Sequence, residues 1–174
     1  MTLLAEGVLK AHWDQSVPVN LARIARAMQL VVAFADLDGC CAQLEISAQR
    51  RQRVLLDRRH PRELQRYGVA HALGHLALHH LRPGMQHRIC VSQSYHVDVE
   101  QRIDSEANGF ALRLLIPEPV LRFSLESGQA RTLDEVAHLF EVAPILIKQR
   151  MADLDLHWPQ TLAQQLRPEV LWEE

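Results

Sequence analysis

The stretch GVAHALGHLALHH, residues 68–80, lies midway along the chain and places His71 and His75 four residues apart. Residues four apart share one face of a helix, with Cβ atoms about 5–6 Å apart, so these two imidazoles could hold one zinc ion. The spacing alone is weak evidence, because ten histidines in 174 residues readily give such a pair by chance. Two hydrogen-bonded core histidines would look the same, so the rest of the chain must decide.

The composition is that of an ordinary globular domain, long enough for one core and a small appendage. The formal net charge of −2 excludes a general attraction to nucleic acid. No apolar run approaches the roughly 20 residues that span a membrane, and the N-terminus lacks a secretion signal, so we expect a cytoplasmic protein with no membrane partner. Cys40, Cys41 and Cys90 match neither a zinc pair nor a secreted disulfide framework, and reduced thiols are expected.

Apolar periodicity predicts an α+β fold in which a small sheet packs on helices. Helices are predicted over residues 2–13, 18–29, 61–81, 99–116, 117–126, 132–141 and 144–154. Strands are predicted over residues 30–34, 40–46 and 52–57. Pro18 is expected in the first turn of the second helix. Residues 84–98 have no helical period and predict a loop or a short extended piece.

The chain is expected to divide into three parts along its length. These are a core at residues 1–117, a small helical subdomain at 118–157 and a peripheral tail at 158–174. Trp158 and Trp172 are expected to dock the tail back onto the rest of the molecule.

The C-terminal helical segment is typical of two short helices joined as in a helix-turn-helix, over residues 134–154. TLDE, residues 132–135, is a capping box that begins the first of them. Near the second helix only Lys148 and Arg150 are basic, which is little for contacts with phosphates. We therefore expect no direct binding of nucleic acid.

A third metal ligand is expected from the next helix, because sites of this kind take a carboxylate about 20–35 residues further on. The segment DSEANGFALRLLIP, residues 104–117, supplies Asp104. Asp104 shares a stripe of the helix with small and apolar residues, namely Ala107, Asn108, Ala111 and Leu115. Such a stripe is the face that packs, so Asp104 is the predicted third ligand.

Two glutamates are the alternatives to Asp104. Glu106 lies about 200° around the helix from Asp104, where it pairs better with Arg102 or Arg113. Glu100 lies one turn earlier than Asp104, on roughly the same face. Glu106 is the fallback as the third ligand, and Glu100 is a weaker alternative.

Other polar residues near the pair have weaker claims. His79, His80 and His87 are set aside as ligands, because the three-ligand set is already filled. Tyr95 and His96 lie between the two helices in sequence and could reach a bound carbonyl oxygen to steady an oxyanion. They are the two candidate catalytic side chains.

Motifs spread over most of the chain resemble the ImmA/IrrE family of metallopeptidases, also known by its DUF955 domain. They are VPVNLARIARAMQL, VLLD, RYGVAHALGHLALH (family pattern RFTLAHELGHLLLH), DSEANGFALRLLIP (family pattern ExxANxFAxxLLMP) and VAHLFEVAPILIKQRMADLDL. The resemblance implies a zincin-like metallopeptidase fold, a catalytic Zn²⁺ and a helix-turn-helix repressor as the protein substrate. Through it His71 and His75 match the paired ligands, and Asp104 stands where the family has its glutamate ligand. Aspartate is one methylene shorter but is an ordinary ligand for zinc.

Ala72 is the graver departure from the family's HExxH motif. The glutamate that the family has there takes a proton from the attacking water and passes it to the leaving amine, which a methyl group cannot do. Losing such a general base typically costs on the order of 10²–10⁴ in rate. Either an engineered inactivation or a natural pseudo-peptidase would place alanine here, and the intact flanking motif favours the first.

We therefore expect a zinc-dependent metalloendopeptidase that cleaves a helix-turn-helix repressor in phage, mobile-element or stress regulation, inactive as written because of Ala72. Its substrate would lie extended along a sheet edge, for which VLLD, residues 54–57, is the candidate. The alternative is a non-catalytic pseudo-peptidase that binds a transcription factor or antitoxin as a regulatory module.

Overall fold

The computed structural model describes residues 2–89, 102–128 and 130–157. The helices are α1 (Thr2–His12), α2 (Leu21–Ala27), α3 (Arg62–Ala77), α4 (Arg102–Leu115), α5 (Glu118–Glu126), α6 (Leu133–Phe140) and α7 (Pro144–Asp153). The strands are β1 (Leu30–Ala35), β2 (Ala42–Ile46), β3 (Gln52–Asp57) and β4 (Gln86–Ile89). The predicted α+β class, with a small sheet packed on helices, is confirmed.

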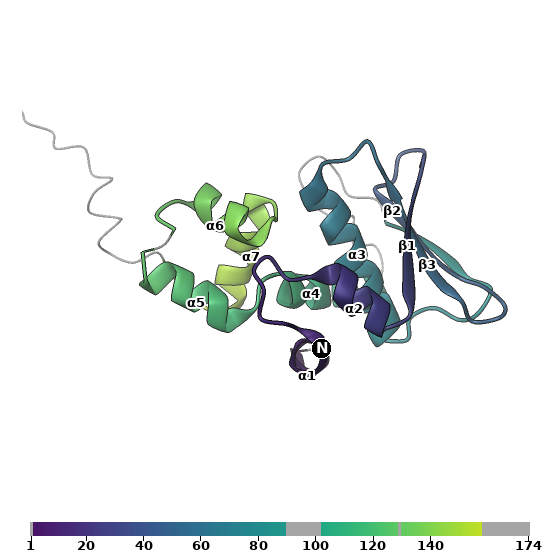
Figure 1. Cartoon of the computed structure of the whole chain (residues 1–174), viewed down its shortest axis with the longest axis horizontal. Coiled ribbons are helices and arrows are strands. Elements are labelled where there is room, and N and C mark those ends of the chain that lie inside the picture. The colour runs from purple at the N-terminus through teal and green to yellow at the C-terminus, as the bar shows by residue number, and fades with distance from the viewer. Residues whose placement is uncertain (1, 90–101, 129, 158–174) are drawn as a thin grey trace, which may run out of the picture.

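The molecule is built in layers around α3 (Figure 1). α2 and α3 pack on one face of the sheet, and α4 packs against α3. α1 lies against α4, while α5, α6 and α7 gather at the end away from the sheet (Figure 1). α3 is therefore enclosed between the sheet and α4, which explains why it is apolar almost all round.

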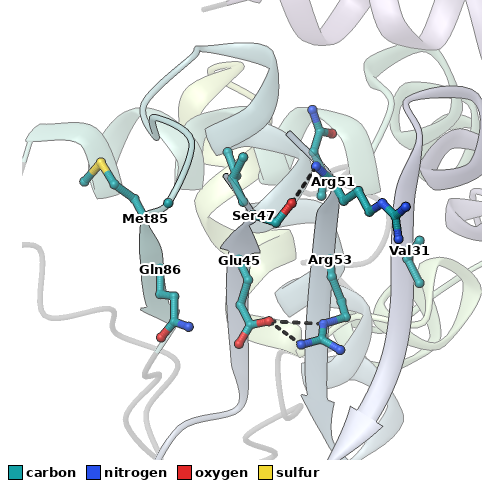
Figure 2. A pocket seen from close by; sticks show the side chains of 10 residues that line it. Val31, Glu45, Ser47, Arg51, Arg53, Met85 and Gln86 are labelled. Atoms are coloured by element: carbon teal, nitrogen blue, oxygen red, sulfur yellow. Dashed lines mark hydrogen bonds and ion pairs between the residues drawn. The ribbon is translucent and has the colours of Figure 1, made fainter. Parts of the chain in front are cut away.

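The sheet has the strand order β1-β3-β2-β4, in which β1 is parallel to β3 and the other two pairs are antiparallel. Alternate residues face the helices and are buried: Ala42, Leu44, Ile46, Val54 and Leu56. On the opposite face Glu45 and Arg53 pair at 2.6 Å beside a shallow cavity of about 460 Å³ that Val31 and Met85 help to line (Figure 2). That face is the polar one, as expected for a sheet covered on one side.

The order of the strands corrects one prediction. β3 lies between β1 and β2, so VLLD, residues 54–57, is the centre of the sheet and not an exposed edge. The edges of the described sheet are β1 and β4. An extended peptide could therefore pair with one of those two strands and not with β3.

Two glycines let α3 approach its neighbours closely. A Cβ at Gly68 would lie 2.9 Å from Ala42 Cβ on β2, and a Cβ at Gly74 would lie 2.9 Å from the Ala107 carbonyl oxygen on α4. Both distances are shorter than real Cβ contacts, so any larger residue would push an element away. Gly74 thus sets how near α4 can come to the two histidines of α3.

Two predictions near the N-terminal half need correction. α2 begins at Leu21, with the Asn20 side chain accepting a hydrogen bond from the Arg23 amide at 3.1 Å, so Pro18 precedes the helix instead of lying in its first turn. Cys40 is disulfide-bonded, so the expectation of reduced thiols is wrong for that residue. Cys41 is buried, and its Sγ lies 3.0 Å from the Ile89 carbonyl oxygen.

The C-terminal helices follow their predicted bounds closely. The capping box is confirmed, since Thr132 Oγ1 accepts from the Glu135 amide at 3.2 Å and Glu135 Oε2 accepts from the Thr132 amide at 3.3 Å. Glu141 at the end of α6 pairs with Arg62 and Arg66 of α3 at 3.0 and 3.6 Å.

The division of the chain into three parts at residues 117 and 157 remains a prediction, and the tail with Trp158 and Trp172 lies outside the described residues. Among the described residues, no helix combines the length and apolar character needed to cross a membrane.

Candidate metal centre

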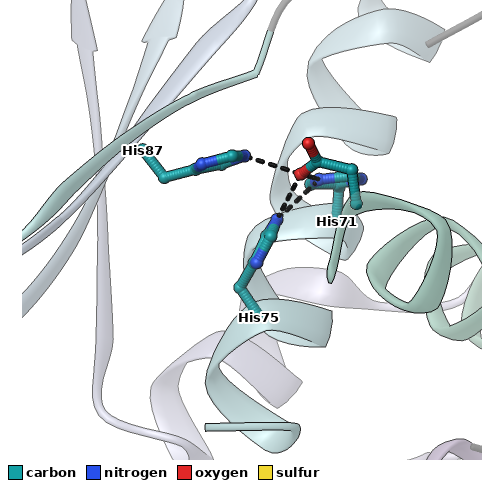
Figure 3. Close-up of side chains that lie close together, drawn as sticks. His71, His75 and His87 are labelled. Atoms are coloured by element: carbon teal, nitrogen blue, oxygen red, sulfur yellow. Dashed lines mark hydrogen bonds and ion pairs between the residues drawn. The ribbon is translucent and has the colours of Figure 1, made fainter. Parts of the chain in front are cut away.

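Four side chains from three elements converge beside α3 (Figure 3). His71 and His75 come from the middle of α3, Asp104 from the first turn of α4 and His87 from β4. Each offers one nitrogen or oxygen atom, and these four atoms all lie within 4.8 Å of one another. The structure thus brings the three predicted ligands together and adds a fourth residue.

The distances are compatible with four ligands around one tetrahedral ion. The Nε2 atoms of His71 and His75 are 2.8 Å apart, and Asp104 Oδ1 lies 2.8 Å from His87 Nε2, 3.3 Å from His75 Nε2 and 3.7 Å from His71 Nε2. Ligands held at about 2.0–2.1 Å around a tetrahedral zinc stand roughly 3.3 Å apart, in the middle of this range. Asp104 Oδ1 is buried, and within the described residues no hydrogen bond to it has acceptable geometry. Three imidazoles and one carboxylate form a donor set that suits Zn²⁺.

Burial favours the form that binds metal in two of the imidazoles, His75 and His87. Burial lowers the pKa of the His75 ring, and the neighbouring His71 and His87 lower it further. Burial also lowers the pKa of His87, although Asp104 opposes this effect. The lowered pKa values favour the uncharged form of both rings, in which a nitrogen lone pair is available to an ion.

Asn108 of α4 fixes the orientation of the His71 ring through the ring nitrogen that does not face the cluster. His71 Nδ1 lies 2.6 Å from Asn108 Oδ1, which also accepts a hydrogen bond from the Tyr67 hydroxyl. An amide oxygen only accepts, so His71 donates from Nδ1 and turns the lone pair of Nε2 toward Asp104. This is the usual support for a histidine that ligates a metal.

A second chain of contacts orients His75. His75 Nδ1 lies 3.1 Å from His80 Nδ1, and His80 Nε2 lies 3.2 Å from Glu106 Oε2. If His80 donates from Nε2 to the carboxylate, its Nδ1 accepts from His75 Nδ1, which leaves His75 Nε2 free for an ion. Arg102 Nε donates to Glu106 Oε1 at 2.8 Å, so the predicted pairing of Glu106 with Arg102 is confirmed.

Ala72 lies next to the centre in sequence but contributes nothing to its chemistry. It is fully buried and belongs to the apolar core. Its methyl group can neither accept nor donate a proton. Of the carboxylates in the described residues, only Asp104 belongs to the cluster. No described acidic group therefore stands in for the glutamate that the HExxH motif has at position 72.

Three of the residues considered from the sequence cannot be placed. Tyr95, His96 and Glu100 lie outside the described residues. Their roles, as oxyanion contacts for the first two and an alternative ligand for the third, stay predictions.

His87 is the member of the cluster that sequence reasoning set aside. Three ligands leave the fourth position of a tetrahedral ion open, and His87 lies where it could fill that position. The signal was the alternation in QHRI, residues 86–89, which places His87 and Ile89 on the same face of a strand. In the sheet His87 stands opposite Leu44, whose side chain faces the helices, and this register points His87 toward α3.

Comparison with known proteins agrees with this arrangement. Residues 28–152 match the Peptidase M78 family, described as the IrrE N-terminal-like domain. No curated protein matches the chain. The match includes all four strands and every residue of the cluster, so the expected resemblance to the ImmA/IrrE metallopeptidases and the zincin-like fold are confirmed. The chain belongs to the IrrE N-terminal-like family of peptidases.

Proposed function

We propose that this protein is a zinc-binding member of its peptidase family that binds a helix-turn-helix repressor and lacks the group needed to cleave it. The observation that carries the proposal is the combination of a complete His71, His75 and Asp104 cluster with a methyl group at Ala72. Zinc, when bound there, would polarise a peptide carbonyl as a Lewis acid. The chain's own residues supply ligands and their orientation, but no described residue supplies a general base.

His87 strengthens the non-catalytic interpretation. Catalytic zinc sites keep one position open for water or substrate, whereas sites with four protein ligands are closed. With His87 in place, the cluster has three imidazoles and one carboxylate, which is enough to close a tetrahedral sphere. Ala72, Asp104 and His87 together are three departures from a three-ligand HExxH site. That number favours a natural pseudo-peptidase over a single engineered replacement.

The repressor is proposed as the partner because the family resemblance implies it, and the edge of the sheet offers a place for it. β4 pairs only with β2 among the described strands, so its outer edge can accept an extended segment. A segment added there would pass directly beside His87. A cytoplasmic location would bring the protein and such a repressor together.

Cleavage and binding of a co-encoded helix-turn-helix protein test the proposal. The unmodified chain loaded with zinc should retain the repressor in a pull-down and leave it intact. Combining Ala72→Glu with His87→Ala restores the missing base and opens the fourth position, and should raise cleavage by at least about 10²-fold. Combining Ala72→Gln with His87→Ala inserts a side chain of the same size without a base, and should cleave no better than the unmodified chain.

Two results would contradict the proposal. Zinc-dependent cleavage by the unmodified chain would show that the base is supplied from elsewhere. Failure of the unmodified chain to retain the repressor would remove the partner. Because Ala72 is fully buried, circular dichroism must first show that both substituted chains are folded.

A further inference from the structure

A second cavity lies at the other end of α4, away from the metal cluster. It has a volume of about 480 Å³ and lies among α1, α5, α7 and the last turn of α4. Leu9, Trp13 and Pro117 give it an apolar wall, and Arg113 and Arg150 give it a charged one. Arg113 follows Asp104 by nine residues, which is roughly 13 Å along a helix. The cavity is therefore separate from the centre described above.

Arg150 is buried in this wall with little to balance its charge. Only 5% of the residue is exposed, and its Nε donates to the Ile116 carbonyl oxygen at 3.1 Å. Within the described residues, Arg150 has no carboxylate within ion-pairing distance. A buried guanidinium needs an anion or several acceptors to offset its lost hydration.

Arg113 adds a second guanidinium to the same wall. Its Nη1 donates to the Gly109 carbonyl oxygen at 2.8 Å, and its Nη2 lies a long 3.8 Å from Asp153 Oδ2. Its Nε is buried and has no hydrogen-bond partner in the described part of the chain. Desolvation lowers the pKa of Arg150, and the charge of Arg113 lowers it further, although Asp153, Glu118 and Glu6 oppose this effect.

The carboxylates around the cavity, Glu6 and Glu118 with the nearby Asp153, offset this charge only in part. Glu118 pairs with Arg122 at 2.8 Å, and Glu6 lies on the exposed side of α1. The lining as a whole has four basic side chains and two acidic ones. Arg113 Nε is the buried donor of this lining that is left without a partner among the described residues.

We propose that this cavity binds a small organic anion, a carboxylate attached to an apolar body. The carboxylate would accept hydrogen bonds from Arg113 and Arg150, as guanidinium groups commonly provide for carboxylates. The apolar body would rest on Leu9, Trp13 and Pro117. The Trp13 indole is held in place by its Nε1–H, which donates to the Ser16 carbonyl oxygen at 2.9 Å.

Calorimetric titration with matched probes tests the site on the full chain. The probes are benzoate, phenylacetate and 3-phenylpropionate, their neutral amides, and inorganic phosphate. At least one carboxylate should bind, and its amide should bind about 10- to 100-fold more weakly, because the amide loses the charge-assisted hydrogen bonds. Phosphate should bind more weakly than that carboxylate, because it lacks the apolar body.

Variants locate the binding. Arg113→Gln should weaken the carboxylate by about 10-fold or more, and Arg150→Lys, which keeps the charge but loses the planar fork, should also weaken it. Lys148→Gln removes one charge from the exposed side of the same helix as Arg150 and should change the affinity less than twofold.

The proposal is overturned if none of the carboxylates binds, if a carboxylate and its amide bind equally, or if Lys148→Gln has the same effect as Arg113→Gln. The wild-type comparison of carboxylate and amide decides the matter even if a variant does not fold. The titration is run with and without zinc. The result therefore does not depend on the metal centre or on the proposed function.

Discussion

Replacing Gly74 with alanine should destabilise the protein, although the same change in a helix is normally favourable. Alanine is better than glycine inside a helix by about 0.8–1.0 kcal/mol. At Gly74, however, the new Cβ would lie 2.9 Å from the Ala107 carbonyl oxygen, 3.1 Å from Ala107 Cα and 3.3 Å from Phe110 Cβ. The shortest contact is about 0.5 Å inside the 3.4 Å at which ordinary van der Waals contact begins, and two of the three atoms are backbone.

The magnitude follows from these opposing effects. Forcing an extra methyl into a packed interface typically costs about 1–3 kcal/mol, because the backbone must shift. After subtracting the gain in helix propensity, we expect Gly74→Ala to lower the free energy of unfolding by up to about 2 kcal/mol. Since α4 carries Asp104, pushing it away should also weaken zinc binding.

Gly7 in α1 is the matched control. Nothing lies within 4 Å of the position of its Cβ, so Gly7→Ala keeps only the favourable effect. Urea unfolding and thermal melts should show Gly7→Ala more stable, by up to about 1 kcal/mol or roughly 2–4 °C, and Gly74→Ala less stable. If Gly74→Ala gains stability as Gly7→Ala does, the close approach of α3 and α4 is not as described.

Three further predictions concern the cluster and the sheet. His80→Ala removes the contact that orients His75 and should weaken zinc binding by about 10- to 100-fold. A competition titration with a chromophoric chelator measures this, and an unchanged affinity would show that His80 does not support the metal centre. His87→Ala should leave one zinc per chain but open its fourth position, so the Co²⁺-substituted protein should change its visible spectrum on adding azide only in that variant. Asp57→Asn should destabilise the fold at pH 7, because the hydrogen bond from Arg59 lowers the pKa of the Asp57 carboxyl well below its usual range. The ionised carboxyl therefore stabilises the fold above about pH 4, and this stabilisation is lost as the pH falls further. Urea unfolding at pH 7 and pH 3 checks this, and an equal loss at both values would contradict it.

Local periodicity was sufficient to predict most elements and three of the four clustered side chains. The spacing of His71 and His75 fixes them on one face of α3, and the apolar stripe of α4 fixes the direction of Asp104. Both inferences use contacts within a single helix, where the rotation per residue is known. For the same reason Glu106 could be assigned to the opposite side.

What depends on strand pairing was not visible in the sequence. The position of β3 at the centre of the sheet comes from its parallel pairing with β1, which leaves no local pattern. The alternation in β4 places His87 and Ile89 on one face, but four residues do not determine which element that face meets, so His87 was not connected with α3. The contact of His80 with both His75 and Glu106 requires the packing of α4 beside the end of α3, which periodicity does not determine.

We propose that His71, His75, His87 and Asp104 together hold one zinc ion. Zinc-edge X-ray absorption on protein purified without chelator, combined with elemental analysis, tests this most directly. We expect one zinc per chain with four nitrogen and oxygen ligands at about 2.0 Å and the scattering pattern of three imidazoles, reduced to two in His87→Ala. Protein that binds no stoichiometric zinc, or a spectrum with only two imidazoles that His87→Ala leaves unchanged, would contradict it.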